Sequence, residues 1–473
     1  MLGHADLLLF SVCAILTIDT LASAASMGVS WFTWWGLTMV LFFVPYGLIT
    51  AELGAAWPQE GGVYVWVREA MGERWGSLAA WFYWINNAYW TPSVFMVFAA
   101  TFHSIVLRDR VGPGLREGVG ATWLQAGIAV ALTWLTVAVG IVRLRVSKWL
   151  PNLGAVVKVG LFVCLGVLGL ATLVQGRPPA NDFSLARFVP NWGESLTFLP
   201  VLLYNALGFE LMSSAGEEMR DPRRDVPRVI LLSGLVIAAV YTLGVLGILL
   251  AVPVGELSLV TGTWDALVVL GWQWGAAGDV VVLLLGFGFL YACVANVVTW
   301  SLGVNRVAAA AAAEGALPAA LGRLHPRYQT PHVAFVAMGV VSTALLLGNA
   351  ALSARADNVF WMVFKLSGVC FLVSYLLLFP AFVILRHRRP NQPRPYVMPG
   401  GRVGTGAAAL FCWLFVAAAC LLFFRPAPTT ADAVSAVRES WLLLAETLVT
   451  AAVGLALMPR RLRGGQKPPA QRS

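Results

Sequence analysis

Apolar stretches long enough to cross a lipid bilayer recur along nearly the whole of this chain. A membrane-spanning helix needs about 20 consecutive, mainly apolar residues. Lipid offers no hydrogen-bond partner to a bare backbone, so each such stretch is expected to be a helix. The pattern predicts an all-α polytopic membrane protein with twelve transmembrane helices. Their approximate bounds are 7–30, 33–55, 74–107, 121–141, 150–175, 193–216, 229–253, 274–311, 332–350, 358–385, 404–424 and 440–458.

Composition excludes a soluble protein of this size. Of the 473 residues, 59% are apolar and only 12% are charged, whereas soluble domains carry roughly 25% charged residues. The net charge of +9 does not indicate a nucleic-acid partner, because the basic residues lie in short connections between apolar segments. The six cysteines lie inside apolar stretches without a C-x-x-C pair. Neither a metal site, nor a disulfide framework, nor any cofactor is therefore expected.

The distribution of Lys and Arg predicts the orientation in the membrane. With the N-terminus placed in the cytoplasm, 22 of these residues fall on the cytoplasmic side and 8 on the other. Basic residues favour the cytoplasmic side, so both termini are predicted to be cytoplasmic in a cytoplasmic (inner) membrane. Ala22-Ser23-Ala24 resembles a signal cleavage site, but no basic residue precedes it. The basic tail 459–473 is expected to be disordered.

Two spans are interrupted by small and polar residues. The first holds Thr17 to Ser26, and the sixth holds Tyr204 to Gly216. Interrupted spans at corresponding positions of two halves indicate a transporter binding site. We therefore predict one five-helix repeat over 1–176 and a second over 190–390. Residues 391–458 would then add two accessory helices.

Four ionisable residues lie within spans, where a charge costs roughly 2.5–3.5 kcal/mol on insertion scales unless it is paired or hydrated. Asp19 would hold a substrate ammonium or a proton, or form an ion pair with Lys158 or Lys365. Glu210 would carry a proton, or bind exposed backbone N–H groups of the broken sixth span. Lys158 would exchange protons or replace a metal cation at helix-end carbonyls, or else extend to the interface. Lys365 would extend outward or pair with Asp19.

Span 3 carries a cluster of aromatic residues at 81, 83, 84, 89 and 90. Most of them are expected to pack or to face lipid. One or two would stack on a cationic substrate.

Three stretches resemble the amino acid–polyamine–organocation superfamily of transporters. They are Ala-Glu-Leu at 51–53 with Trp-Pro-Gln-Glu-Gly-Gly-Val-Tyr-Val-Trp-Val at 57–67 and Arg-Trp-Gly at 74–76; Gly-Phe-Glu at 208–210 with Glu-Met-Arg-Asp-Pro-Arg-Arg-Asp-Val-Pro at 218–227; and Trp300 and Gly303 with Asn-Arg at 305–306 and Gly-Ala-Leu-Pro at 315–318. The likeness is greatest to the bacterial glutamate/GABA-exchanger-like permeases, with arginine/agmatine exchangers more distant. It implies a five-plus-five inverted-repeat fold with broken helices 1 and 6 around a central site.

The resemblance also implies roles for particular residues. Glu210 matches the span 6 acid, Tyr204 an aromatic gate, and Lys158 a span 5 lysine that replaces sodium. Thr91 and Trp300 match substrate or gate positions. With the span breaks, the predicted substrate-binding residues are Ile18, Asp19, Thr20, Ala22, Ser23, Asn87, Thr91, Tyr204, Asn205, Leu207, Gly208 and Trp300, and the predicted proton-coupling residues are Lys158 and Glu210.

The predicted function is secondary active transport of amino acids, by proton-coupled symport or by exchange, with alternating access at a mid-membrane site. The expected partners are the small-molecule substrate, the bilayer and protons, in a monomer or homodimer. Many relatives carry a Gly-Ser-Gly-type stretch in span 1 where this chain has Asp19. A carboxylate there repels a substrate carboxylate, which favours a polyamine or other amine as the alternative cargo. A non-transporting membrane enzyme or sensor is the remaining class, but the five histidines are scattered and no phosphate-cradling motif occurs.

Overall fold

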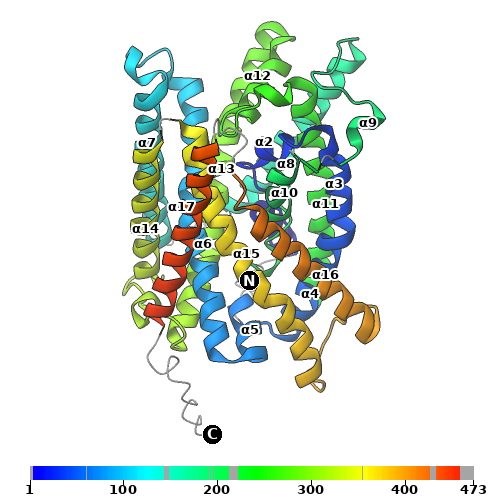
Figure 1. The fold of residues 1–473 in the computed structure, drawn as a ribbon, viewed down its shortest axis with the longest axis vertical. Coiled ribbons are helices and arrows are strands. Elements are labelled where there is room, and N and C mark those ends of the chain that lie inside the picture. The colour runs from blue at the N-terminus through cyan, green and yellow to red at the C-terminus, as the bar shows by residue number, and fades with distance from the viewer. Residues whose placement is uncertain are drawn as a thin grey trace.

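The computed structural model of the chain is a bundle of long helices with their axes roughly along one direction (Figure 1). The structure describes residues 4–59, 61–142, 149–190, 192–193, 195–211, 222–353, 355–426 and 433–458. Within this part of the chain it contains helices and no strand. Ten segments are long and apolar enough to cross a membrane, and two shorter apolar helices complete a twelve-span protein. The predicted all-α membrane architecture is confirmed.

The two shorter helices belong to the interrupted spans 1 and 6. In span 1, α1 (His4–Ile15) ends before a non-helical stretch, and α2 (Leu21–Ala25) follows it. In span 6, α10 (Ser195–Tyr204) ends before a turn and a short 3₁₀ segment at 209–211. Both breaks lie where small and polar residues predicted them. Residues 212–221, which include the end of the predicted span 6 and the first part of the motif at 218–227, and the tail 459–473 lie outside the described residues.

The other ten spans are continuous, although span 2 contains a π-helical turn (Met39–Phe43) between α3 and α4. Three further helices were not expected from the sequence: α5 (Val63–Met71) follows span 2, α9 (Leu185–Phe188) follows span 5, and α12 (Gly262–Trp272) follows span 7. The spans are α3 (Trp31–Thr38) with α4 (Val44–Ala56), α6 (Glu73–Phe102), α7 (Gly118–Val142), α8 (Trp149–Val174), α11 (Pro222–Ala251), α13 (Gly275–Ala313), α14 (His332–Leu352), α15 (Ala356–Arg388), α16 (Gly401–Leu422) and α17 (Ala433–Leu457).

The packing of the spans places the two broken helices at the centre. Helix α6 packs along α15, α7 along α14 and α8 along α11, while α1 contacts α8, α11 and α13. Close approach of α8 and α11 depends on small residues, since a Cβ at Gly247 would lie 2.4 Å from the backbone of Leu165. Helix α17 is peripheral: 17% of its most apolar window is buried, against 67% for α15. The division into two five-helix repeats and two accessory helices stays a prediction, and this packing is compatible with it.

Candidate functional site

The unwound stretch of span 1 leaves the carbonyl end of α1 without intrahelical partners, and two side chains occupy it. Lys158 Nζ donates hydrogen bonds to the carbonyls of Cys13, at 2.6 Å, and Leu16, at 2.8 Å. Trp300 Nε1 donates to the carbonyl of Ala14 at 2.7 Å. Lys158 is fully buried, so its extension to the interface is ruled out. A helix C-terminus favours a cation, and here the cation is part of the protein.

The break in span 6 is built around Gly208 and a tyrosine of α4. Gly208 has a φ of 128°, which an L side chain rarely adopts, and a Cβ there would lie 3.0 Å from Ile15 and 3.1 Å from Trp300. Tyr46 Oη accepts the amide hydrogens of Gly208 and Phe209, each at 3.0 Å. The unwound segment is thereby held against the broken end of α1 without bare amides.

A hydrogen-bonded network joins the two breaks. Thr17 Oγ1 and Thr20 Oγ1 donate to Asn205 Oδ1 at 3.0 and 2.7 Å. The amide of Thr17 donates to Tyr241 Oη at 2.8 Å, and that hydroxyl donates to the Thr17 carbonyl at 3.0 Å. Thr20 and Asn205 were predicted to bind substrate. In this conformation they are bonded to each other and join span 1 directly to span 6, while Tyr241 of α11 holds Thr17.

Asp19 lies within the span 1 break with its charge incompletely satisfied. Trp90 Nε1 donates to Asp19 Oδ2 at 3.2 Å, and Oδ1 has no hydrogen-bond partner among the described residues. The side chain is 1% exposed. No ion pair joins Asp19 to Lys158 or Lys365, both of which are described, so the structural-pair alternatives are wrong. Burying an ionised carboxylate without a direct ion-pair partner is costly, which makes this oxygen a suitable acceptor for a cationic group.

Aromatic rings surround this carboxylate and link it to span 6. The ring centroids of Trp90 and Trp300 are 6.0 Å apart, and those of Trp300 and Phe371 are 5.5 Å apart. Tyr204 continues the wall, with its centroid 5.2 Å from that of Phe371 and 5.0 Å from that of Phe364. Aromatic faces attract cations and exclude water. Tyr204 and Trp300, for which the resemblance implied a gating role, are both 5% exposed, and that role stays a prediction.

Three tyrosines, Tyr46, Tyr83 and Tyr375, surround Glu210 and are called the tyrosine cage below. Tyr46 Oη donates to Glu210 Oε2 at 2.5 Å, and Tyr83 Oη donates to Oε1 at 2.9 Å. Tyr375 Oη lies 3.4 Å from Tyr46 Oη. The three rings come from α4, α6 and α15, so Glu210 couples the span 6 break to the surrounding scaffold. The amides of the break reach Glu210 through the Tyr46 hydroxyl.

The remaining predicted substrate residues divide into two groups. Ile18, Ala22, Ser23 and Leu207 are buried at the breaks, and Ser23 Oγ has no hydrogen-bond partner among the described residues. Asn87 and Thr91 instead use their side chains within the scaffold. Asn87 Nδ2 donates to Ser301 Oγ at 3.3 Å, and Thr91 Oγ1 donates to the Asn87 carbonyl at 2.8 Å.

Sequence reasoning missed several residues of this region. Asn296 is fully buried on α13, and neither its Oδ1 nor its Nδ2 has a partner among the described residues. It lies one helical turn before Trp300 and so shares the face that meets the breaks. Tyr46, Tyr241 and Tyr375 were also missed, because single tyrosines in apolar spans carry no local signal. Within the described chain no group of three His, Cys, Asp or Glu residues is placed to hold a metal ion.

Lys365 does not belong to this site. Its Nζ donates to Glu439 Oε1 of α17 at 2.7 Å and to the carbonyl of Arg425 at 2.6 Å. Both alternatives drawn from the sequence, outward extension and pairing with Asp19, are therefore wrong. The sequence shows that this lysine lies within a span, but it does not show which residue of another helix pairs with it.

Comparisons of the sequence with known proteins found a family model and several relatives. A family model described as amino acid permease matches residues 2–453. A probable agmatine/putrescine antiporter of Lactococcus lactis is 34% identical over 391 residues, which cover 82% of this chain and 80% of that protein. A glutamate/gamma-aminobutyrate antiporter of the same species is 26% identical over 406 residues, covering 82% and 76%. A polyamine transporter of Oryza sativa is 26% identical over 445 residues, covering 89% and 70%.

Proposed function

This chain belongs to the amino acid permease family, within the amino acid–polyamine–organocation superfamily, and from that premise we propose that it exchanges cationic amines across a cytoplasmic membrane. Family membership makes it a membrane transporter of amino acids or amines. The finer proposal concerns the charge of the transported molecule and the solute or ion whose movement is coupled to its transport. It includes cytoplasmic termini, a monomer or homodimer, and protons as a coupling partner.

The observation that carries the proposal is the free oxygen of Asp19. A substrate ammonium would donate to Oδ1 while Trp90 keeps its hydrogen bond to Oδ2. The ammonium and the Asp19 carboxylate would form a buried ion pair, so the carboxylate would no longer lack a direct partner. The rings of Trp90 and Trp300 would face the alkyl and cationic parts of the ligand. The names of two of the relatives described above specify agmatine, putrescine or polyamines.

Lys158 and Glu210 have complementary parts in the proposed cycle. Lys158 places an amino group at the carbonyl end of α1, and in its protonated form it would replace a metal ion there. Glu210 would take up or release a proton as the tyrosine cage rearranges. Alternating access would then move α1, α2 and α10 against the scaffold of α6, α7, α13 and α14.

Transport of a zwitterionic amino acid is the second candidate, and membership of the amino acid permease family favours it. The half-helix ends of a broken span suit a carboxylate and an ammonium. Asp19 opposes this reading, because a second carboxylate nearby would repel the first in a low-dielectric pocket.

Counterflow in proteoliposomes separates these candidates. Vesicles preloaded with unlabelled putrescine, agmatine, glutamate or GABA would be offered the same labelled solute. We expect exchange of putrescine or agmatine, and on the order of a hundredfold loss of amine affinity in Asp19→Asn, as for a buried pair that loses one partner. Exchange of amino acids with no amine exchange would overturn the amine assignment.

The matched control is Asp182→Asn. Asp182 is an exposed acid after α8, and hydrogen bonds from the amide and hydroxyl of Ser184 lower the pKa of its carboxyl. It lies outside the breaks, so its variant should retain full exchange.

A further inference from the structure

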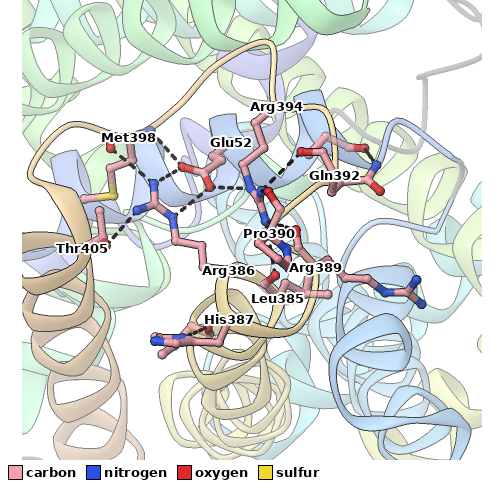
Figure 2. Close-up of polar contacts among 12 residues, drawn as sticks. Glu52, Leu385, Arg386, His387, Arg389, Pro390, Gln392, Arg394, Met398 and Thr405 are labelled. Atoms are coloured by element: carbon pink, nitrogen blue, oxygen red, sulfur yellow. Dashed lines mark hydrogen bonds and ion pairs between the residues drawn. The ribbon is translucent and has the colours of Figure 1, made fainter.

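A pocket at the end of the bundle predicted to face the cytoplasm lies apart from the transport site. It has a volume of about 470 Å³, which is within the range of small-molecule sites. Its walls come from the last turns of α15, the connection 389–400 and the first turns of α16 (Figure 2). The lining residues are Phe382, Val383, Arg386, His387, Pro390, Gln392, Arg394, Val397, Arg402, Thr405 and Gly406.

The inner wall of the pocket is a buried ion-pair cluster. Arg386 pairs with both oxygens of Glu52, and Arg394 Nε lies 3.2 Å from Glu52 Oε1. The Met398 amide also donates to Glu52, at 2.8 Å. Figure 2 shows both guanidinium groups directed at this one carboxylate. One acid is shared by two arginines, so the cluster retains a net positive charge.

The outer wall adds positive charge that nothing in the described chain neutralises. Arg402 is exposed and lines the pocket, and no hydrogen bond or ion pair of its side chain occurs among the described residues. Residues 386–402 contain five arginines and one histidine but no acid. Gly401 begins the 22-residue helix α16, whose first amides and dipole also favour an anion. The pocket is therefore suited to a phosphate group.

Apolar walls distinguish this pocket from a site for a free anion. Phe382, Val383 and Val397 line it beside the arginines. On α16, Val403 is 85% exposed and Leu410 is 58% exposed, and their spacing of seven residues places both on one face of the helix. A ligand that matches both parts has an anionic head and an apolar tail.

We propose that this pocket binds the phosphate of an anionic phospholipid in the leaflet at that end of the bundle, with Arg402 and the start of α16 as the main contacts. Basic pockets between transmembrane helices hold such headgroups. Arg386 and Arg394 would contribute long-range charge while keeping their bonds to Glu52. The lipid would wedge between α15 and α16 and strengthen their junction. This site is independent of the cargo proposed above.

The test uses the purified full-length protein in neutral detergent. Dioleoylphosphatidylglycerol is titrated while the melting temperature is followed, and native mass spectrometry counts retained lipids. Dioleoylphosphatidylcholine and inorganic phosphate are titrated in parallel. We expect saturable stabilisation by phosphatidylglycerol alone, and about fivefold weaker binding in Arg402→Gln, as for one basic contact with an anionic lipid.

Three variants make the result specific. Arg402→Lys should recover most of the affinity. The control Arg323→Gln, an exposed arginine between α13 and α14, should bind like the parent protein. Equal stabilisation by phosphatidylcholine, or an unchanged affinity in Arg402→Gln, would refute the site. Stabilisation by inorganic phosphate alone would replace the lipid with a soluble anion. Counterflow of the variants in phosphatidylcholine vesicles verifies that they are folded.

Discussion

Lys158 shows how one side chain can substitute for a bound ion. A charge at bilayer depth is tolerated when it has close partners, and its ammonium has two carbonyls within 2.8 Å. The sequence predicted that this lysine matters. It did not predict which carbonyls would accept its hydrogen bonds, since they lie 145 and 142 residues away in the chain.

Replacing Lys158 with Met should destabilise the protein. The carbonyls of Cys13 and Leu16 would lose their donor while staying buried, and a buried unsatisfied acceptor costs about 1–3 kcal/mol. We expect a lower melting temperature in detergent and loss of counterflow. The half-buried neighbour Val159→Met should melt like the parent protein, and a Lys158→Met variant with normal transport would contradict the assigned role.

Glu210 is the residue at which a proton would be coupled to movement of span 6. Its two oxygens accept hydrogen bonds from Tyr46 and Tyr83, and Tyr46 in turn holds the amides of the break. A change in the protonation of this carboxyl must rearrange at least one of these bonds, because a protonated oxygen becomes a donor.

Glu210→Gln should therefore remove the pH dependence of counterflow, since an amide cannot gain or lose the proton. The amide accepts poorly from two tyrosine donors and will slow exchange at any single pH, so the measurement is the slope of the exchange rate against pH. Glu446→Gln, on the peripheral α17, is the control and should keep the pH profile of the parent. A pH profile unchanged in Glu210→Gln would exclude this carboxyl as the coupling group.

At the scale of elements, α15 is fastened to its neighbours at both ends by ion pairs. Near its start Lys365 pairs with Glu439 of α17, and near its end Arg386 pairs with Glu52 of α4. Away from α15, another ion pair joins Arg68 of α5 to Glu314, which lies just beyond the end of α13. These contacts cross between helices that are far apart in sequence, so no periodicity along one helix reveals them.

Lys365→Met should destabilise the α15–α17 junction by about 3–5 kcal/mol, the usual cost of leaving one member of a buried pair unpaired. Lys365 is 1% exposed and Glu439 is 12% exposed. Adding Glu439→Leu should recover much of this loss, because no buried charge remains. Thermal melting in detergent measures both effects. Arg108→Gln, which breaks a pair exposed by 62% and 81%, should change the melting temperature little.

At the scale of the whole molecule, the structure is closed around its centre. The side chains of Asp19, Tyr204 and Trp300 are each 5% exposed or less, so cargo would enter only after helices move. Helix α5 and the α15–α16 connection lie at one end of the bundle, and α9 (Leu185–Phe188) and α12 lie at the opposite end (Figure 1). The orientation predicted from the sequence places the first of these ends in the cytoplasm.

Cysteine labelling tests that orientation. Arg177→Cys places an exposed thiol between α8 and α10, and Arg323→Cys places one between α13 and α14. In intact cells, a membrane-impermeant maleimide should label Arg177→Cys and spare Arg323→Cys until the cells are permeabilised. The parent protein measures the background, which should be low because its six cysteines are buried or half-buried. The reverse pattern would invert the topology.

Sequence by itself determined the twelve helices, the two breaks and the ionisable residues at the centre, because lipid permits only helical backbone and tolerates interruption only beside polar groups. It did not determine α5, α12 or the tyrosine cage. Tertiary structure decided which partners meet: Lys158 with α1 rather than with Asp19, Lys365 with Glu439, and Trp90 with Asp19. These pairings join residues that are 71 to 145 positions apart in the sequence, so they depend on how the helices pack, and that information is absent from any single helix.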